Sequence, residues 1–119
     1  MTNLFDLQDS ITAANGNATL AKDLFTMLLN ELESRLKQIK TCFYDHDLQG
    51  LAQHTHKLYG ATAYCIVPEL RSSTEKLENA LNNGELNNLE DLVEQITKDI
   101  QHLINEGPRF LELDWEKYC

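Results

Sequence analysis

His56 differs from the other histidines of this chain in the small side chains that surround it on a predicted helix. Residues 48–65 have the pattern of an amphipathic helix, in which successive side chains are about 100° apart. Its apolar and small residues fall within about 80° of one another, and they are Leu51, Leu58, Thr62 and Cys65. His56 lies about 160° from the centre of this group, so we expect its ring to face water. An exposed imidazole is largely unprotonated near neutral pH and is a good nucleophile.

The predicted exposed face around His56 is poor in large side chains. The positions one turn or more away along this face are Ala52, Gln53, Tyr59, Gly60 and Ala63. A solvated helix face usually carries Lys, Glu and Gln, and Gly60 costs about 1 kcal/mol relative to Ala inside a helix. Small residues beside an imidazole allow a flat partner surface to approach the ring with its own reactive group and metal. A glycine can also serve only the packing of a neighbouring helix, so the pattern by itself leaves both interpretations open.

The positions of His54 and Cys65 on the predicted helix favour structural roles for both residues. His54 falls near the edge of the buried arc, and Cys65 lies on the apolar face. A zinc site is the enzyme-like alternative, but no two histidines have the i, i+4 spacing that converges on a metal from one helix face. The four histidines are His46, His54, His56 and His102. We therefore expect no metal site. The odd count of three cysteines favours reduced thiols in the cytoplasm over a secreted disulfide framework.

Five amphipathic segments, of which the first is short, predict the elements that position His56. They are residues 4–14, 18–43, 48–65, the segment from Pro68 to the Asn82-Asn83-Gly84 turn, and residues 87–106. Gly16 follows the first segment, because glycine adopts the left-handed conformation at a helix end without strain. Asn17 is suited to cap the second segment, and Asp45 or Asp47 to cap the third. A proline suits the first turn of the fourth.

The predicted fold is all-α. Four helices joined by short connections favour an antiparallel up-down four-helix bundle, to which the short N-terminal helix is added. The predicted buried stripe of the second helix is Leu20, Leu24, Leu28, Leu32, Leu36, Ile39 and Phe43. We expect residues 1–107 to form this domain. Residues 108–119 show no clear period and are predicted to be a C-terminal tail or linker, which could also pack back on the bundle.

Length and charge restrict the possible functions. A chain of 119 residues is one domain without room for a separate nucleotide-binding lobe. Its formal net charge of -9 repels nucleic acid and anionic membrane surfaces, so we expect neither nucleic acid nor direct membrane contact. No signal peptide or membrane span is expected either.

The run His56-Lys57-Leu58-Tyr59-Gly60-Ala61 resembles the signature of histidine-phosphotransfer domains, in which a phosphorylated histidine is followed four residues later by glycine and then a small residue. The likeness continues through Tyr64 and the run Val67-Pro68-Glu69-Leu70 to Leu77, and it covers about residues 3–107. The chain most resembles the C-terminal phosphotransfer modules of bacterial tripartite hybrid sensor histidine kinases. The signature coincides with the exposed face predicted above, which strengthens the resemblance.

The resemblance implies roles for individual residues. His56 matches the phospho-accepting histidine, and Lys57 matches a frequent lysine that screens phosphate charge. Gly60 matches the glycine that opens a docking surface, to which Ala52, Gln53 and Ala63 would also belong.

The chain departs from the family pattern at three positions. Tyr59 stands where many members have lysine, and Ile66 replaces a common glycine. Glu78 stands where a glutamine often orients the imidazole, and it could accept an N–H from the ring in the same way. These departures leave the nucleophile intact but change the groups that would stabilise phosphate.

The function implied is that of a phosphorelay intermediate. His56 would accept a phosphoryl group from a receiver-domain aspartyl phosphate and pass it to the aspartate of another response regulator. The chain would need no cofactor of its own, with Mg²⁺ on the partner receiver domain. It could be covalently part of a hybrid sensor kinase, at the cytoplasmic end of an inner-membrane protein. Autokinase activity is not expected, because no glycine-rich phosphate loop is present. The alternative is a non-catalytic helical bundle that binds a partner through the same face.

Overall fold

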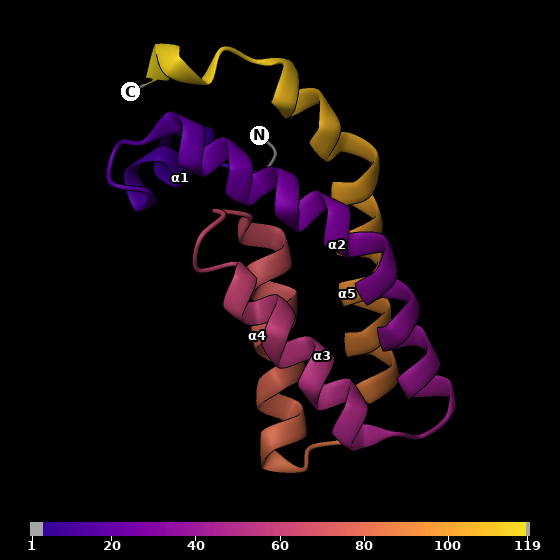
Figure 1. The fold of residues 1–119 in the computed structure, drawn as a ribbon. Coiled ribbons are helices and arrows are strands. Elements are labelled where there is room, and N and C mark those ends of the chain that lie inside the picture. Colours follow the sequence, from indigo (N-terminus) through magenta and orange to yellow (C-terminus); the bar gives the residue numbers. More distant parts are fainter. Residues whose placement is uncertain (1–3, 119) are drawn as a thin grey trace.

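The structure is a computed structural model that describes residues 4–118, and within them it contains helices and no strands (Figure 1). The five α-helices are α1 (Leu7–Ala13), α2 (Ala18–Tyr44), α3 (Leu48–Ala61), α4 (Pro68–Asn83) and α5 (Leu89–Glu106). Two 3₁₀-helices follow, η1 (Gly107–Glu112) and η2 (Trp115–Tyr118). None of the helices in the described part of the chain has the length and apolar character needed to span a membrane.

The four long helices form an antiparallel bundle, as predicted. Helix α2 packs against α3 and α5, and α4 packs against the same two helices, so the four close around one core (Figure 1). The fully buried side chains at its centre come from all four helices, and they include Leu32, Ile39, Leu51, Leu58, Leu77, Ile96, Ile100 and Leu103. Helix α1 lies against the N-terminal part of α2 as the additional helix. The all-α fold is therefore confirmed.

Capping residues define where the helices begin. The Asn17 side chain accepts a hydrogen bond from the Leu20 N–H (3.0 Å) at the start of α2. Asp47, rather than Asp45, caps α3 by accepting from the Gly50 N–H (2.9 Å). Each carboxylate or amide oxygen satisfies a backbone donor that the first helical turn leaves without a partner.

Two predicted helix boundaries differ from the structure by three or four residues, and one predicted helix face is wrong. Helix α3 ends at Ala61 instead of residue 65, because Thr62 caps it and the chain turns toward Pro68. Helix α1 begins at Leu7 instead of residue 4, after the cap Asp6. In α2, Leu20 is 44% exposed and Leu24 is only partly buried. Other α2 positions, namely Ala18, Ala21 and Phe25, are buried there instead. The buried face turns because this part of α2 contacts α1 and η2.

The C-terminal segment returns along the N-terminal part of α2 (Figure 1). Four aromatic rings pack together there, those of Phe5, Phe25, Phe110 and Trp115. The Phe5 and Phe25 rings stack with centroids 4.1 Å apart, and Trp115 lies 5.6 Å from Phe5. The indole N–H of Trp115 donates to the Phe110 carbonyl (2.9 Å). Residues 107–118 thus add apolar burial to this end of the molecule, while the faces of α3 and α4 that carry the predicted site stay uncovered by them.

Candidate functional site

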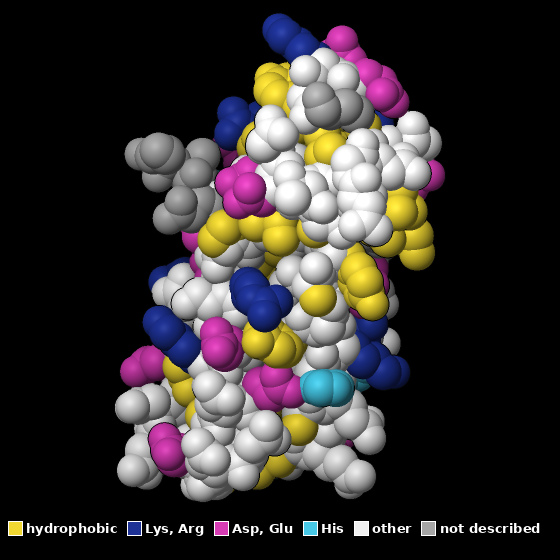
Figure 2. Space-filling view, turned by 90° about the vertical axis from the view of Figure 1, so that its left-hand side faces the viewer, with side chains coloured by type: hydrophobic (Ala, Val, Ile, Leu, Met, Phe, Trp, Pro, Cys, Tyr) yellow, Lys and Arg dark blue, Asp and Glu magenta, His cyan; other side chains and the backbone are white. Residues whose placement is uncertain are grey.

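The His56 side chain projects from the middle of α3 and is 73% exposed, as the helical pattern predicts. The buried residues of the helix, among them Leu51, Thr55 and Leu58, lie on the opposite side and fix its rotation. Figure 2 shows this face, with a histidine ring beside an acidic side chain and Lys or Arg side chains on both sides of the pair. The ring is therefore accessible to a second protein.

Glu78 of α4 holds one side of the His56 ring. Its Oε1 contacts the ring Nδ1, and the Glu78 side chain is 17% exposed. An ionised carboxylate only accepts hydrogen bonds, so Nδ1 is the donor in this contact, and in the neutral ring the lone pair is then on Nε2. Nε2 is the ring nitrogen that Glu78 does not contact, and it belongs to a side chain that is 73% exposed. The structure places Glu78 at the imidazole, where the sequence analysis expected it, and in the neutral ring this contact favours the tautomer with its proton on Nδ1.

Gly60 leaves open space one turn from His56. A Cβ added to Gly60 would have no heavy atom within 4 Å beyond its own helix backbone and chain neighbours. The packing interpretation is therefore wrong for this glycine. Gly50 provides the contrast, because a Cβ there would lie 2.9 Å from the Cys42 Sγ. Packing against neighbouring side chains therefore favours glycine at Gly50 but does not require it at Gly60.

The other predicted docking residues share this face. Gln53 and Ala63 are exposed, and Ala52 is half-buried. Together with Gly60 they surround His56 with short side chains and one flexible amide. The structure thus brings together the four residues predicted for a docking surface.

Tyr59 and Lys57 turn to opposite sides of this face. The half-buried Tyr59 extends toward α4, where its hydroxyl accepts a hydrogen bond from Arg71 Nη2 (3.2 Å). The exposed Lys57 lines a groove toward α2. Sequence reasoning missed Arg71, because only the register of α4 against α3 reveals which α4 side chain reaches Tyr59.

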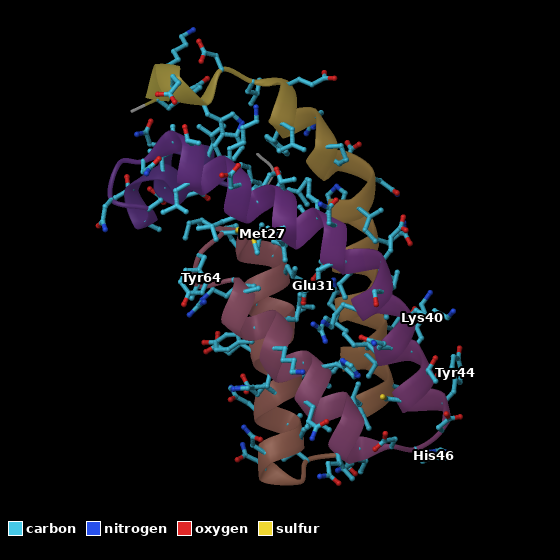
Figure 3. All side chains as sticks on the ribbon, viewed as in Figure 1. Met27, Glu31, Lys40, Tyr44, His46 and Tyr64 are labelled. Carbon is cyan, nitrogen blue, oxygen red and sulfur yellow. The ribbon has the colours of Figure 1, made fainter. Side chains whose placement is uncertain are left out.

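The groove beside Lys57 is apolar, and the sequence did not predict it. It has a volume of about 340 Å³ between α2 and α3, and its lining includes Leu24, Met27, Leu28, Ala61, Tyr64 and Cys65. Met27 and Tyr64 are 65% and 62% exposed. Figure 3 shows Met27, Tyr64 and Glu31 around it. The pattern of α2 did not indicate this groove, because Leu24 and Leu28 belong to the stripe predicted to be buried and only Met27 lies outside it.

His54 has the structural role predicted for it. Its Nδ1 lies 2.8 Å from Arg35 Nη1, and the same guanidinium is paired with Glu31. Because arginine only donates, the His54 Nδ1 accepts and the ring is neutral. Burial and the nearby Arg35 and Lys57 charges lower the pKa of His54 below its usual 6.5. This ring joins α2 to α3 and is not available as a nucleophile.

The buried thiol of Cys65 is also unreactive. Burial raises its pKa to about 11, so the thiolate that reacts or binds metal is scarce at neutral pH. Within residues 4–118, no three His, Cys, Asp or Glu side chains are grouped closely enough to hold a metal ion. His56 with its Glu78 contact is therefore the candidate reactive group.

A sequence model of the family described as "Hpt domain" matches residues 23–106, which include most of α2 and all of α3, α4 and α5. The chain belongs to the Hpt-domain family. The resemblance inferred from the run at residues 56–61 is confirmed, and with it histidine phosphotransfer in two-component signalling as the function of this class of domain.

Curated relatives of this Hpt domain include sensor kinases. It is 36% identical over 78 residues to the sensor protein GacS of Pseudomonas syringae pv. syringae, covering 66% of this chain and 9% of that protein. It is 25% identical over 107 residues to the signal transduction histidine-protein kinase BarA of Escherichia coli K12, covering 89% of this chain and 12% of that protein. The phosphorelay intermediate protein rdeA of Dictyostelium discoideum is 22% identical over 116 residues, which are 98% of this chain and 45% of that protein. The chain thus spans about a tenth of the two kinases.

Solved structures share the fold. The HPT domain of a sensor hybrid histidine kinase from Shewanella superposes with a TM-score of 0.86 at 24% identity, covering 92% of this chain and 94% of that one. The histidine-containing phosphotransfer protein HptB of Pseudomonas aeruginosa gives 0.76 at 18% identity, covering 91% and 94%. The superpositions extend beyond the segment that the family model matches.

Proposed function

We propose that this Hpt domain is a phosphorelay intermediate in which His56 is the phospho-acceptor. It takes a phosphoryl group from the aspartyl phosphate of one receiver domain and transfers it to the aspartate of another response regulator. The observation that supports this most strongly is the exposed His56 ring, held at Nδ1 by Glu78 and bordered by the open surface at Gly60.

The reaction uses the lone pair of Nε2. As the nitrogen–phosphorus bond forms, the phosphorus–oxygen bond to the receiver aspartate breaks, and the electron pair leaves with the aspartate carboxylate. The ring becomes a cation that keeps its proton on Nδ1, and the Glu78 carboxylate stabilises this positive charge through the contact already present. Transfer to the second receiver is the same step in reverse. The domain contributes mainly position and orientation.

The chemistry that this chain lacks is supplied by its partner. We infer that Mg²⁺ is bound by the receiver domain, where it neutralises charge on the transferring phosphoryl group. The domain then has no cofactor of its own and no autokinase activity. Its surface of Ala52, Gln53, Gly60 and Ala63 admits the receiver's acidic site close to Nε2, and Lys57 screens phosphate charge at one side. Met27 and Tyr64 offer apolar contact area next to this surface.

We also propose the cellular setting. The partners are response-regulator receiver domains in the cytoplasm, and the domain is either free or the cytoplasmic end of an inner-membrane hybrid sensor kinase. The similarity to a small part of GacS and of BarA supports the second arrangement.

A transfer assay tests the proposal. Purified receiver domains from the genome that encodes this chain are charged with radiolabelled acetyl phosphate and mixed with the domain. We expect acid-labile, base-stable label on the wild type and on His54→Gln, and none on His56→Gln. His54→Gln is a matched control, because it removes a histidine two residues away that is held by Arg35. Label that persists in His56→Gln would place the acceptor elsewhere, and binding of receivers without any label would favour a non-catalytic interaction module.

A further inference from the structure

Arg71, in the first turn of α4, is held against the end of α3 by three contacts. Its Nη1 donates to the Thr62 hydroxyl (3.0 Å), and its Nη2 donates to the Tyr59 hydroxyl (3.2 Å). Its guanidinium carbon lies 4.7 Å from the centre of the Tyr59 ring. Both partners lie on one side of α3, three residues apart, so the planar guanidinium has a fixed place although the residue is exposed.

The charge of Arg71 is not neutralised within the described chain. Both hydrogen-bond partners are hydroxyl groups, and no carboxylate of residues 4–118 lies within 4.0 Å of it. Arg35 differs, because its guanidinium is paired with Glu31. A guanidinium has five N–H donors, and two of those of Arg71 are used. In a chain with ten basic and nineteen acidic residues, an exposed, ordered and unpaired cation is suited to bind an anion.

The position of Arg71 limits what that anion can be. Tyr59 is one turn from His56, and Arg71 precedes Glu78 by two turns, which is about 10 Å along α4. A phosphoryl group on Nε2 is too small to span that distance. A partner protein docked on His56 would, however, cover both positions. Figure 2 shows Lys or Arg side chains on either side of an exposed histidine on one face of the molecule.

We propose that Arg71 is a receiver-binding residue that contacts a carboxylate on the docking surface of the receiver, and that Tyr59 and Thr62 position it. This inference rests on the proposed function. Because Arg71 lies about 10 Å along α4 from the Glu78 that holds the His56 ring, the carboxylate belongs to the rim of the receiver's docking surface and not to the Mg²⁺ ligands beside its aspartate. The unpaired guanidinium of Arg71 is complementary to such a carboxylate in charge and in its planar donor geometry. Because its side chain is already ordered, it loses little conformational freedom on binding.

Electrostatic attraction of this kind acts on encounter and affinity rather than on the transfer step. We therefore measure kcat/KM for transfer from the receiver that reacts fastest in the panel, at low and at high ionic strength. Arg71→Gln should lower kcat/KM about fivefold at low salt, with kcat nearly unchanged, and the difference should shrink as salt screens the charge. Arg71→Lys should keep most of the salt dependence.

Two comparisons separate binding from a structural effect. Arg109→Gln is the matched control, because Arg109 also lies over an aromatic ring, that of Phe110 at 5.1 Å, but in the C-terminal segment. It should leave kcat/KM unchanged. Phosphoramidate, a small phosphodonor, should label His56 equally fast in the wild type and in Arg71→Gln, since no receiver takes part. Tyr59→Phe, which removes one hydrogen bond to the guanidinium, should reduce kcat/KM about twofold.

Three results would overturn the inference. In the first, Arg71→Gln transfers as fast as the wild type at low salt. In the second, the loss persists unchanged at high salt or appears equally with phosphoramidate, which would indicate a structural role. In the third, no receiver transfers to the wild type, and the proposed function then fails together with the inference that rests on it.

Discussion

Glu78 offers the sharpest test of how the His56 ring is prepared for transfer. Its carboxylate contacts Nδ1, and in the proposed reaction phosphorylation at Nε2 turns the ring into a cation. In Glu78→Gln, an amide oxygen can still accept the N–H, but the negative charge is gone. Hydrogen bonds with a charged partner contribute about 1.5–3 kcal/mol, against about 1 kcal/mol for neutral ones. Because the ring is 73% exposed, solvent screens much of this difference.

The expected loss of phosphohistidine stability is therefore about 0.5–1 kcal/mol, which is a factor of about two to five in an equilibrium constant. The assay mixes equal amounts of domain and phosphorylated receiver and measures the label on each protein at equilibrium. In Glu78→Gln the label should shift toward the receiver by that factor. In Glu78→Ala no group orients the ring, and the transfer rate should also fall, by about tenfold.

Glu75→Gln is the matched control for this experiment. Glu75 lies on the same helix three residues earlier, is exposed, and forms no ion pair within residues 4–118. It should leave both the equilibrium and the rate unchanged. If Glu78→Ala reaches the wild-type equilibrium at the wild-type rate, the contact with Nδ1 plays no part in the reaction, and the argument from the tautomer is refuted.

Three further predictions concern stability and docking. Gly60→Ala should raise the free energy of unfolding by about 0.5–1 kcal/mol, because its Cβ meets open space. Gly60→Leu should slow transfer from a receiver at least tenfold and leave labelling by phosphoramidate unchanged. Equal transfer by both variants would contradict the proposed docking surface. The pKa of His54 is lower in the folded than in the unfolded chain, so its contribution to stability is fully present above pH 6.5 and should fall as the pH drops below that value. Between pH 7.5 and pH 5.5, the thermal stability of His54→Asn should therefore fall less than that of the wild type. An equal fall in both proteins would exclude this ring as the cause. Trp115→Ala should lower the free energy of unfolding by about 3–5 kcal/mol in a denaturant titration, because Trp115 is only 3% exposed and packs among aromatic rings. The folded variant should still accept a phosphoryl group. An unchanged stability would show that the C-terminal segment contributes no packing.

Local signals predicted most of the scaffold from the sequence. Asn17 and Asp47 act as caps through their own backbone neighbours, and Gly84 ends α4 with a positive φ of 69°. Each of these features is determined within a few residues, so a single sequence contains it. The exposure of His56 followed in the same way from the helical period of α3.

The errors occur where distant segments decide the outcome. Leu20 is exposed because α1 and η2 cover a neighbouring face of α2, and nothing in the local pattern of that helix indicates this. The partner of Tyr59 depends on the register between α3 and α4, so Arg71 could not be identified from spacing. Glu78 was predicted through a family resemblance and not through the pattern itself. The helical period of a sequence does not contain the register between one helix and the next, so contacts that depend on that register could not be predicted.

Because the residues of the proposed docking face are separate from those of the core, we expect that partner choice can change without a change of fold. Arg71, Lys57 and Gly60 lie on the docking face without supporting the core, whose side chains come from the opposite sides of the helices. Substitutions on this face therefore change the contact with a receiver at little cost in stability. In the proposed reaction the transferring atoms belong to His56 and to the receiver, so we expect such substitutions to leave the chemistry intact as well. A chain of this kind can acquire a new receiver through a few surface charges, and Arg71, ordered but unpaired, is the position where we expect such a change to have the largest effect.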